Sequence, residues 1–297
     1  MKRKGLIAAV LLLTFISLNI GCRESFNKMK LNDLGGVYMS EFDDLDLEHE
    51  LSGRLSEGEA VEVFAEATQS SSLLRWGIKR NPDNRTPDAD PGAPQLLKKY
   101  GGLYIGDTSQ KRIYLTFDEG YENGYTGKIL DVLKENNVKA VFFITGPYLK
   151  QHQDLVRRMV EEGHEVGNHT VHHPSLPTIS NQEIEEEVLG LDRAFREKFG
   201  KGMRYLRPPK GEYSEISVSV THELGYRHLF WSFAYDDWYR DRVRGKEYAY
   251  NIVMRNLHNG AVLLLHAVSK DNADALDMII KGAREKGYEF GVIDEIN

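Results

Sequence analysis

The sequence predicts an α/β fold in which parallel strands close, fully or in part, into a (β/α) barrel. From about residue 111 onward, short β-rich runs alternate with longer helical segments, about seven times over roughly 190 residues. The runs 140–145 and 261–266 are almost wholly apolar, as expected for strands buried on both faces. An open, doubly wound sheet is the alternative. The sequence contains no internal repeat and no Gly-rich phosphate loop.

Local patterns place the individual elements. The predicted strands are 113–117, 140–145, 165–167, 204–207, 228–233 and 261–266. The predicted helices are 126–136, 154–162, 181–199, 215–224, 246–256 and 273–286. Asn181 is the expected N-cap of the long acidic helix. Residues 81–94 contain four of the nine prolines, so this stretch is predicted to be extended or turn-rich and not helical.

Length and composition exclude several classes of protein. The chain has 297 residues, 41% of them apolar and 28% charged, so it can bury a substantial core. It is neither wholly disordered nor a polytopic membrane protein. The net charge of −7 gives no support to nucleic-acid binding, and a monomer is expected. The single cysteine, Cys22, excludes an intramolecular disulfide and a thiolate zinc cluster, so any metal site must use His, Asp and Glu.

The N-terminus, residues 1–22, has the features of an export signal. A basic start at 2–4 precedes an almost wholly apolar run at 6–18. The residues before Cys22 resemble a lipobox, although Asn19 stands where leucine is usual, so Cys22 is a candidate for lipidation. An uncleaved membrane anchor is the alternative. In both cases the working domain is expected outside the cytoplasm and near the membrane.

Residues 23–70 are predicted to form an acidic, flexible tether. Between 31 and 70 the chain has eleven acidic residues and one basic residue, Arg54. Few large apolar side chains recur there at a regular period, which is typical of a solvated segment. The negative charge therefore belongs to the tether, and residues 71–297 are nearly neutral.

Polar side chains follow the predicted strands. In parallel α/β folds the carboxyl ends of the strands meet on one side of the sheet, where active sites form. One ionisable residue after a strand is usually a turn former, but several in phase indicate a site. The five motifs are Thr-Phe-Asp-Glu-Gly at 116–120, His-Thr-Val-His-His at 169–173, Arg-Pro-Pro-Lys-Gly at 207–211, Asp-Asp-Trp at 236–238 and Leu-Leu-His at 264–266.

These residue types point to metal-assisted hydrolysis. His169 and His173 lie on a turn or short helix, and on a helix a spacing of four places both imidazoles on one face, where they can bind one cation. A carboxylate would complete a facial triad, and Asp118 and Glu119 are close by. Asp118 is also a candidate base for a metal-bound water.

Three further residues would support the base and supply an acid. Arg207 would keep the predicted base ionised and oriented. His266 would protonate a leaving amine, and Asp237 would hold that imidazole in its charged form. The set therefore predicts hydrolysis of an amide or ester.

The five motifs, in this order, resemble those of the NodB-type polysaccharide deacetylases, carbohydrate esterase family four. The resemblance covers roughly residues 111–297 and implies a distorted (β/α)7–8 barrel. It implies removal of N-acetyl groups from glycans with a bound divalent metal, commonly zinc, with cobalt, manganese and magnesium as alternatives. It assigns Asp118 as base, His266 as acid, Arg207 and Asp237 as their partners, His169 and His173 as metal ligands, Trp238 and Leu264 as the acetyl pocket, and the Lys210 N–H as an oxyanion donor.

Within that family the chain resembles the muramic-acid deacetylases of spore cortex. Stretches at 76–107, 117–126 and 264–273 carry this resemblance, which extends the domain to residues 71–297. It implies that the enzyme binds peptidoglycan and deacetylates N-acetylmuramic acid before the sugar closes to muramic δ-lactam. The lactyl carboxylate of that sugar calls for a nearby cation, for which Lys210 is the first candidate and Arg75 a remoter one.

Two positions depart from the family pattern. Most members have Asp, the third metal ligand, where Glu119 stands. The longer Glu119 is either a ligand or turned away. Ala234 occupies a position that is often Asp, which Asp236 or Asp237 would replace. Two alternatives therefore stay open, a deacetylase of N-acetylglucosamine polymers and a catalytically silent glycan-binding paralogue. The intact acid and base favour an enzyme.

Overall fold

The computed structural model describes residues 70–296 of the chain. They belong to one unit, Thr68–Asn297. The predicted export signal at 1–22, with Cys22, and residues 23–69 of the predicted tether lie outside the described residues. Within residues 70–296, none of the helices combines the length and the apolar character that a membrane crossing requires.

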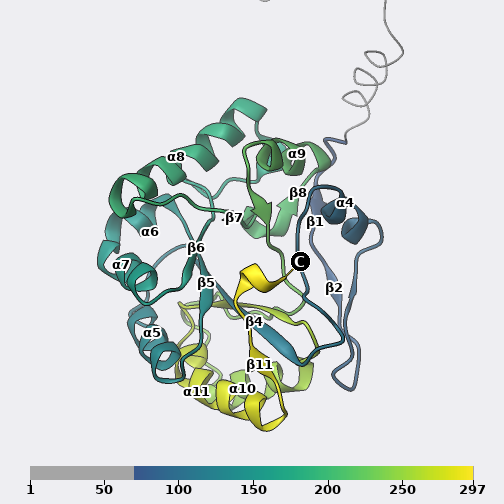
Figure 1. Cartoon of the computed structure of the whole chain (residues 1–297), viewed down its shortest axis with the longest axis vertical. Helices are drawn as coiled ribbons and strands as arrows, with labels where there is room; N and C mark the ends of the chain where they lie inside the picture. Colours follow the sequence, from purple (N-terminus) through teal and green to yellow (C-terminus); the bar gives the residue numbers. More distant parts are fainter. Residues whose placement is uncertain (1–69, 297) are drawn as a thin grey trace, which may run out of the picture. The chain divides into compact units, whose positions relative to one another are not determined.

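Parallel strands form the centre of this unit, and helices surround them (Figure 1). Neighbouring strands follow the order β10 (Val262–His266), β4 (Arg112–Glu119), β5 (Ala140–Ile144), β6 (Glu165–Asn168), β7 (Tyr205–Leu206) and β9 (Arg227–His228). The short β11 (Glu289–Phe290) pairs with the start of β4. All of these pairs are parallel, so the carboxyl ends of the strands lie on one side. The predicted parallel α/β architecture is confirmed.

An irregular segment closes the sheet between β9 and β10. Phe233 forms a parallel bridge with Leu263. The N–H groups of Ser232 and Phe233 both donate to the carbonyl of Val262, at 3.0 and 3.2 Å. Two donors on one carbonyl interrupt the regular ladder, as in a β-bulge. The structure therefore confirms a distorted, partly closed barrel, whereas the strand predicted at 228–233 is regular only at its first residue.

The helices outside the sheet follow the predicted order. They are α5 (Thr126–Glu135), α6 (Gly146–Gln151), α7 (Gln153–Glu161), α8 (Asn181–Phe199), α9 (Glu215–Glu223), α10 (Lys246–Asn256) and α11 (Lys270–Glu285), with short 3₁₀ turns at Leu176–Thr178, Pro209–Gly211 and Ile293–Glu295. The helix predicted at 154–162 corresponds to α7 and is preceded by α6, which the Thr145 side chain caps. Helix α11 begins three residues earlier than predicted because the Ser269 side chain caps it.

The N-cap of α8 is Ser180, so the prediction of Asn181 was wrong by one residue. The Ser180 hydroxyl accepts a hydrogen bond from the N–H of Glu183 at 3.3 Å. The Glu183 carboxylate accepts one from the N–H of Ser180 at 2.8 Å. This reciprocal capping box satisfies two backbone donors that the first helical turn leaves free.

The segment before β4 packs against the barrel. Strand β1 (Leu74–Arg75) pairs antiparallel with β8 (Glu212–Tyr213), and β2 (Ile78–Lys79) pairs with β3 (Asp88–Ala89). The prediction that 81–94 is not helical was wrong at its end, because α4 (Ala93–Lys99) begins there. Pro94 lies in the first turn of that helix, where a missing N–H costs nothing.

Alternation along β4 separates the outer core from the barrel interior. Ile113, Leu115 and Phe117 belong to the large apolar cluster that the helices cover. Tyr114 belongs to a second cluster with Val262 and residues of β5 and β7. Successive side chains of a strand point to opposite faces. Even-numbered residues of β4 therefore face the interior of the barrel, and odd-numbered residues face the helices.

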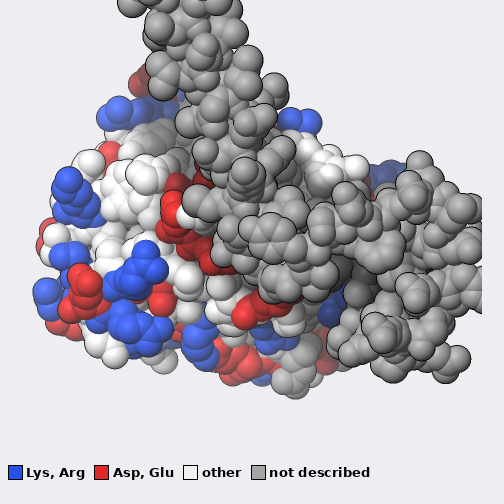
Figure 2. All heavy atoms as spheres, turned by 90° about the horizontal axis from the view of Figure 1, so that it is seen from above, with Lys and Arg blue, Asp and Glu red and all other residues white. Residues whose placement is uncertain are grey.

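The surface carries mixed charges. Figure 2 shows Lys and Arg side chains interspersed with Asp and Glu over the coloured part of one face. Surface ion pairs include Arg204 with Asp294 at 2.9 Å and Arg158 with Asp131 at 2.7 Å. This mixture agrees with the near neutrality of residues 71–297 in the sequence.

Candidate active site

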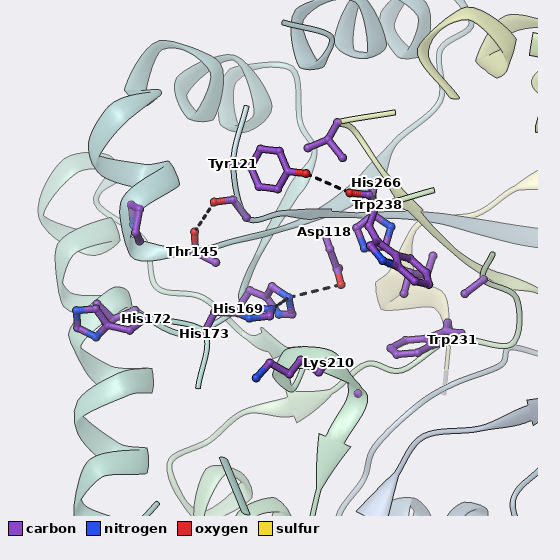
Figure 3. A pocket seen from close by; sticks show the side chains of 17 residues that line it. Asp118, Tyr121, Thr145, His169, His172, His173, Lys210, Trp231, Trp238 and His266 are labelled. Carbon is purple, nitrogen blue, oxygen red and sulfur yellow. Dashed lines mark hydrogen bonds and ion pairs between the residues drawn. The ribbon is translucent and has the colours of Figure 1, made fainter. Parts of the chain in front are cut away.

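A pocket of about 780 Å³ opens at the carboxyl ends of the strands (Figure 3). Asp118 on β4 and His266 on β10 are directly opposite each other in the parallel ladder. The pocket is also lined by residues of the loop after β6, of the turn Pro209–Gly211 and of the loop before α10; those predicted from the sequence are Asp118, His169, His173, Lys210, Trp238, Leu264 and His266. The structure thus brings residues of all five motifs to one cavity.

Asp118 is held by a buried arginine. Nη1 of Arg207 donates to Oδ1 of Asp118 at 2.7 Å, and the Arg207 side chain is fully buried. The guanidinium also donates to the carbonyl of Leu229 and to the hydroxyl of Thr116, at 2.8 and 2.9 Å. Burial raises the pKa of Asp118, but the charges of Arg207, His169 and His266 outweigh it, so the pKa lies below its ordinary value. The carboxylate is therefore ionised at neutral pH, as a base must be.

His266 is oriented by Asp237. The Nδ1 of His266 lies 2.7 Å from Oδ1 of Asp237, and the backbone N–H of His266 donates to Oδ2 at 2.9 Å. Nδ2 of Asn272 donates to the same Oδ2 at 2.6 Å. Burial lowers the pKa of His266, but Asp237 and Asp118 raise it above its ordinary value. The ring can therefore hold a proton on Nε2, the nitrogen left for the substrate.

His169 and His173 meet on a turn, and the helical alternative is excluded. Thr170 and His173 adopt left-handed φ values of 68° and 61°. Nδ1 of His169 lies 2.8 Å from the Arg207 carbonyl, which fixes the proton on Nδ1 and leaves Nε2 as an acceptor. The two Nε2 atoms are 3.2 Å apart, and burial lowers the pKa of His173 to about 4. Two neutral nitrogens facing each other in this way fit a divalent cation.

Glu119 is turned away from this histidine pair. It lies on the odd-numbered face of β4, is fully buried, and neither carboxylate oxygen has a hydrogen-bond partner. Burial raises the pKa of Glu119 well above its ordinary value, and Glu122 and Asp118 add to this effect. Within residues 70–296, no three His, Cys, Asp or Glu side chains are arranged to hold a metal ion. The two histidines fit a cation, and Glu119 does not complete their ligand set.

The remaining predicted residues divide between the pocket and its surroundings. Leu264 is buried at the pocket wall, and the Trp238 ring lies edge-on to the ring of His266 at 5.8 Å. In Figure 3, Lys210 lies on the side of Asp118 away from Tyr121, and its backbone has a left-handed φ of 61°. Arg75 instead pairs with Glu212 on β8, at 3.0 Å.

Ala234 stands where relatives often have Asp, and the neighbouring loop supplies the carboxylate instead. Asp236 pairs with Arg242 and Arg244, so its carboxylate is engaged outside the pocket. Asp237 is the residue that reaches His266. His172, expected to face outward, is exposed and pairs with Glu187 at 2.7 Å.

Sequence reasoning assigned no role to two polar residues behind the site, Thr116 and Asn272. Thr116 lies two residues before Asp118 on the inward face of β4, so strand alternation was a usable signal. Asn272 lies in the first turn of α11, where its N–H donates to the capping Ser269. The sequence held no signal that the same Asn272 side chain would contact Asp237.

Comparison with known proteins places this geometry among related enzymes. Residues 105–229 match the family model described as polysaccharide deacetylase. The peptidoglycan-N-acetylmuramic acid deacetylase PdaA of Bacillus subtilis is 42% identical over 247 residues, covering 83% of this chain and 91% of PdaA. An uncharacterised 30.6 kDa protein of Geobacillus stearothermophilus is 48% identical over 231 residues, which are 77% of this chain and 87% of that protein.

Solved structures of family 4 carbohydrate esterases also match this chain. The structure of B. subtilis PdaA, a family 4 carbohydrate esterase, matches with a TM-score of 0.75 and 44% identity, over 76% of this chain and 97% of that one. A family 4 carbohydrate esterase from Bacillus anthracis matches with a TM-score of 0.65 and 43% identity, over 77% of this chain and 98% of that one.

Proposed function

This chain belongs to the polysaccharide deacetylase family, and on that premise we propose that it removes the acetyl group from N-acetylmuramic acid in peptidoglycan. One observation carries the proposal. A carboxylate held ionised by Arg207 and an imidazole whose pKa is raised by Asp237 face one pocket from paired strands. A base and an acid opposed in this way suit amide hydrolysis, and a glycan-binding protein without activity has no need of them.

The reaction divides between Asp118 and His266. Asp118 takes a proton from the attacking water as the water oxygen bonds to the acetyl carbon. His266 gives its Nε2 proton to the amide nitrogen as the carbon–nitrogen bond breaks, which yields acetate and the free sugar amine. Lys210 lines the pocket, and its backbone N–H is a candidate donor to the developing oxyanion.

His169 and His173 are the residues that would hold a divalent metal, and zinc is our first candidate because imidazole suits it. Cobalt, manganese and magnesium are the alternatives. A bound cation would polarise the acetyl carbonyl and lower the pKa of the attacking water.

Two observations support N-acetylmuramic acid as the substrate: the names of the relatives and a lysine side chain in the pocket. PdaA of B. subtilis, named a peptidoglycan-N-acetylmuramic acid deacetylase, covers most of this chain. Lys210 lines the pocket, and its side chain is our candidate to meet a lactyl carboxylate. The free amine would then close with that carboxylate to the δ-lactam of spore cortex. We further propose a monomer that works outside the cytoplasm, held at the membrane through residues 1–22 or a lipid on Cys22, because peptidoglycan lies there.

Acetate release tests the proposal. The protein is incubated, with and without added zinc, on peptide-free cortex-type glycan and on chitin oligomers. Acetate from the muramoyl glycan is expected, at a higher kcat/KM than from chitin. An Asp118→Asn variant is expected to lose about 10²-fold or more in kcat. Acetate from neither glycan contradicts the activity, and equal use of both contradicts the muramoyl preference.

A further inference from the structure

Three exposed aromatic side chains gather on one rim of the pocket. In the described part of the chain, the large aromatic side chains with the greatest exposure are Tyr121, Trp238 and Tyr239, at 42%, 46% and 46%. The Tyr121 hydroxyl donates to the carbonyl of Trp238 at 3.1 Å, which joins the loop after β4 to the loop before α10. The rings of Trp238 and Tyr239 lie 5.4 Å apart. Exposed aromatic groups gathered in one place are typical of a binding surface.

Arg240 lies on this rim, and no carboxylate in the described part of the chain pairs with it. Its guanidinium is 5.5 Å from the centre of the Tyr121 ring, and Nη2 donates to Oδ1 of Asn123 at 3.3 Å. Among residues 70–296, no carboxylate forms an ion pair with Arg240. Arg242 and Arg244, on the same loop, both pair with Asp236. Arg240 is thus positioned by neutral contacts. Its remaining guanidinium N–H groups are available to donate to a carboxylate.

The rim lies where a glycan strand would leave the pocket. His266 touches Trp238 and would protonate the departing sugar amine, so the reacting sugar lies on this side of the pocket. Figure 3 shows Tyr121 and Lys210 on opposite sides of Asp118. A cation near Tyr121 is therefore separate from the one proposed for the lactyl group of the reacting sugar.

We propose that Arg240, held by Tyr121 and Asn123, binds a lactyl carboxylate on a neighbouring muramoyl unit of the same strand. The inference rests on the proposed function and deepens it. The Arg240 site would bind the glycan strand at a sugar other than the one that reacts. The ligand class is a carboxylate borne on a glycan. A chitin strand has the same backbone without that group and would gain nothing from Arg240.

Calorimetric binding tests the inference. The measurements use an Asp118→Asn background so that the glycan is not consumed. The probes are peptide-free muramoyl–glucosamine strands of two and eight sugars and chitin oligomers of the same lengths. Arg240→Gln is expected to weaken binding of the eight-sugar muramoyl strand about tenfold. Binding of the disaccharide and of both chitin oligomers is expected to change less than about twofold.

Arg242→Gln is the matched control, because that arginine is also exposed on the same loop but already has a carboxylate partner. It is expected to leave all four affinities unchanged. An equal loss on muramoyl and chitin strands, or no loss on either, overturns the inference. Binding of peptide-bearing strands is measured as well. If Arg240→Gln weakens the binding of these strands alone, the ligand of Arg240 is not the lactyl carboxylate.

The two proposals fail separately. Selective binding that depends on Arg240, without acetate release by the wild-type protein, overturns the proposed activity alone. Acetate release from muramoyl glycan with no effect of Arg240→Gln overturns the inference alone. If the Asp118→Asn protein binds none of the strands and the wild-type protein releases no acetate, both are overturned.

Discussion

Asp118 and His266 are register partners in the parallel pair of β4 and β10, so their side chains project side by side into the barrel interior. The hydrogen-bond register of two central strands therefore sets the spacing of the proposed base and acid. A slip of one residue in either strand would turn one of these side chains from the barrel interior to the helix side. The buried residues along both strands oppose such a slip.

Arg207→Met is expected to lower both stability and activity. The substitution leaves the buried Asp118 carboxylate unpaired, which costs about 3–5 kcal/mol in the free energy of unfolding. It also raises the pKa of Asp118, so the acidic limb of the kcat/KM profile moves to higher pH. Urea unfolding and a pH–rate profile measure the two effects.

The lowered pKa of Asp118 also gives stability a defined pH dependence. This contribution is present above the ordinary pKa of the carboxyl and is lost as pH falls through the lowered value. Lys281→Met is the control, because Lys281 forms an exposed pair with Asp277 that contributes about 0–1 kcal/mol. Similar losses in the two variants would contradict a special role for Arg207.

Asp237→Asn is expected to narrow the pH range of activity from the alkaline side. The neutral amide no longer raises the pKa of His266, so the imidazole loses its proton at lower pH. The stability that this raised pKa contributes is present below the ordinary histidine pKa and is lost as pH rises through the raised value. Asp236→Asn, whose carboxylate pairs with surface arginines, should leave the profile in place. Identical shifts would count against the assignment of Asp237.

Lys210→Asn is expected to reduce kcat/KM on muramoyl glycan about tenfold and to leave chitin oligomers within about twofold. Asparagine tolerates the left-handed backbone of this position, so the variant removes the cation without straining the turn. Lys210→Arg should restore most of the muramoyl activity. A parallel loss on both glycans would assign the Lys210 side chain to the shape of the turn instead of the lactyl group.

Glu119→Gln is expected to leave zinc affinity within about threefold, because the Glu119 side chain faces the helices. His173→Ala is the contrasting variant and should lose zinc binding about tenfold or more. Isothermal titration of the apo protein with zinc measures both. A loss in Glu119→Gln as large as that in His173→Ala would show that Glu119 is a ligand.

The sequence was most informative where strands are buried on both faces. The runs at β5 and β10 are almost wholly apolar, and each was found within one residue of its bounds. The orientation of Glu119 stayed open between a ligand and a side chain turned away, for a physical reason. The first strand was predicted to end at Phe117, so strand alternation was not applied to Asp118 and Glu119. The ladder continues through both, so alternation sends them to opposite faces.

Contacts between distant segments were beyond a reading of the sequence. The irregular closure before β10 depends on two N–H groups sharing the carbonyl of Val262. Such pairing is specified by the packing of the finished barrel and leaves no local pattern. The N-cap at Ser180, in contrast, could have been predicted, because the sequence Ser-Asn-Gln-Glu at 180–183 already contains the capping box.

Arg207 contacts both halves of the proposed chemistry. Its side chain holds the carboxylate of Asp118, and its backbone carbonyl holds the ring of His169. For protein engineering, this means that the base and the cation-binding histidines cannot be redesigned independently. A substitution of Arg207 that loosens its contact with Asp118 will also displace His169. Variant libraries designed to accept new acyl groups should therefore change the residues of the pocket wall and keep Arg207.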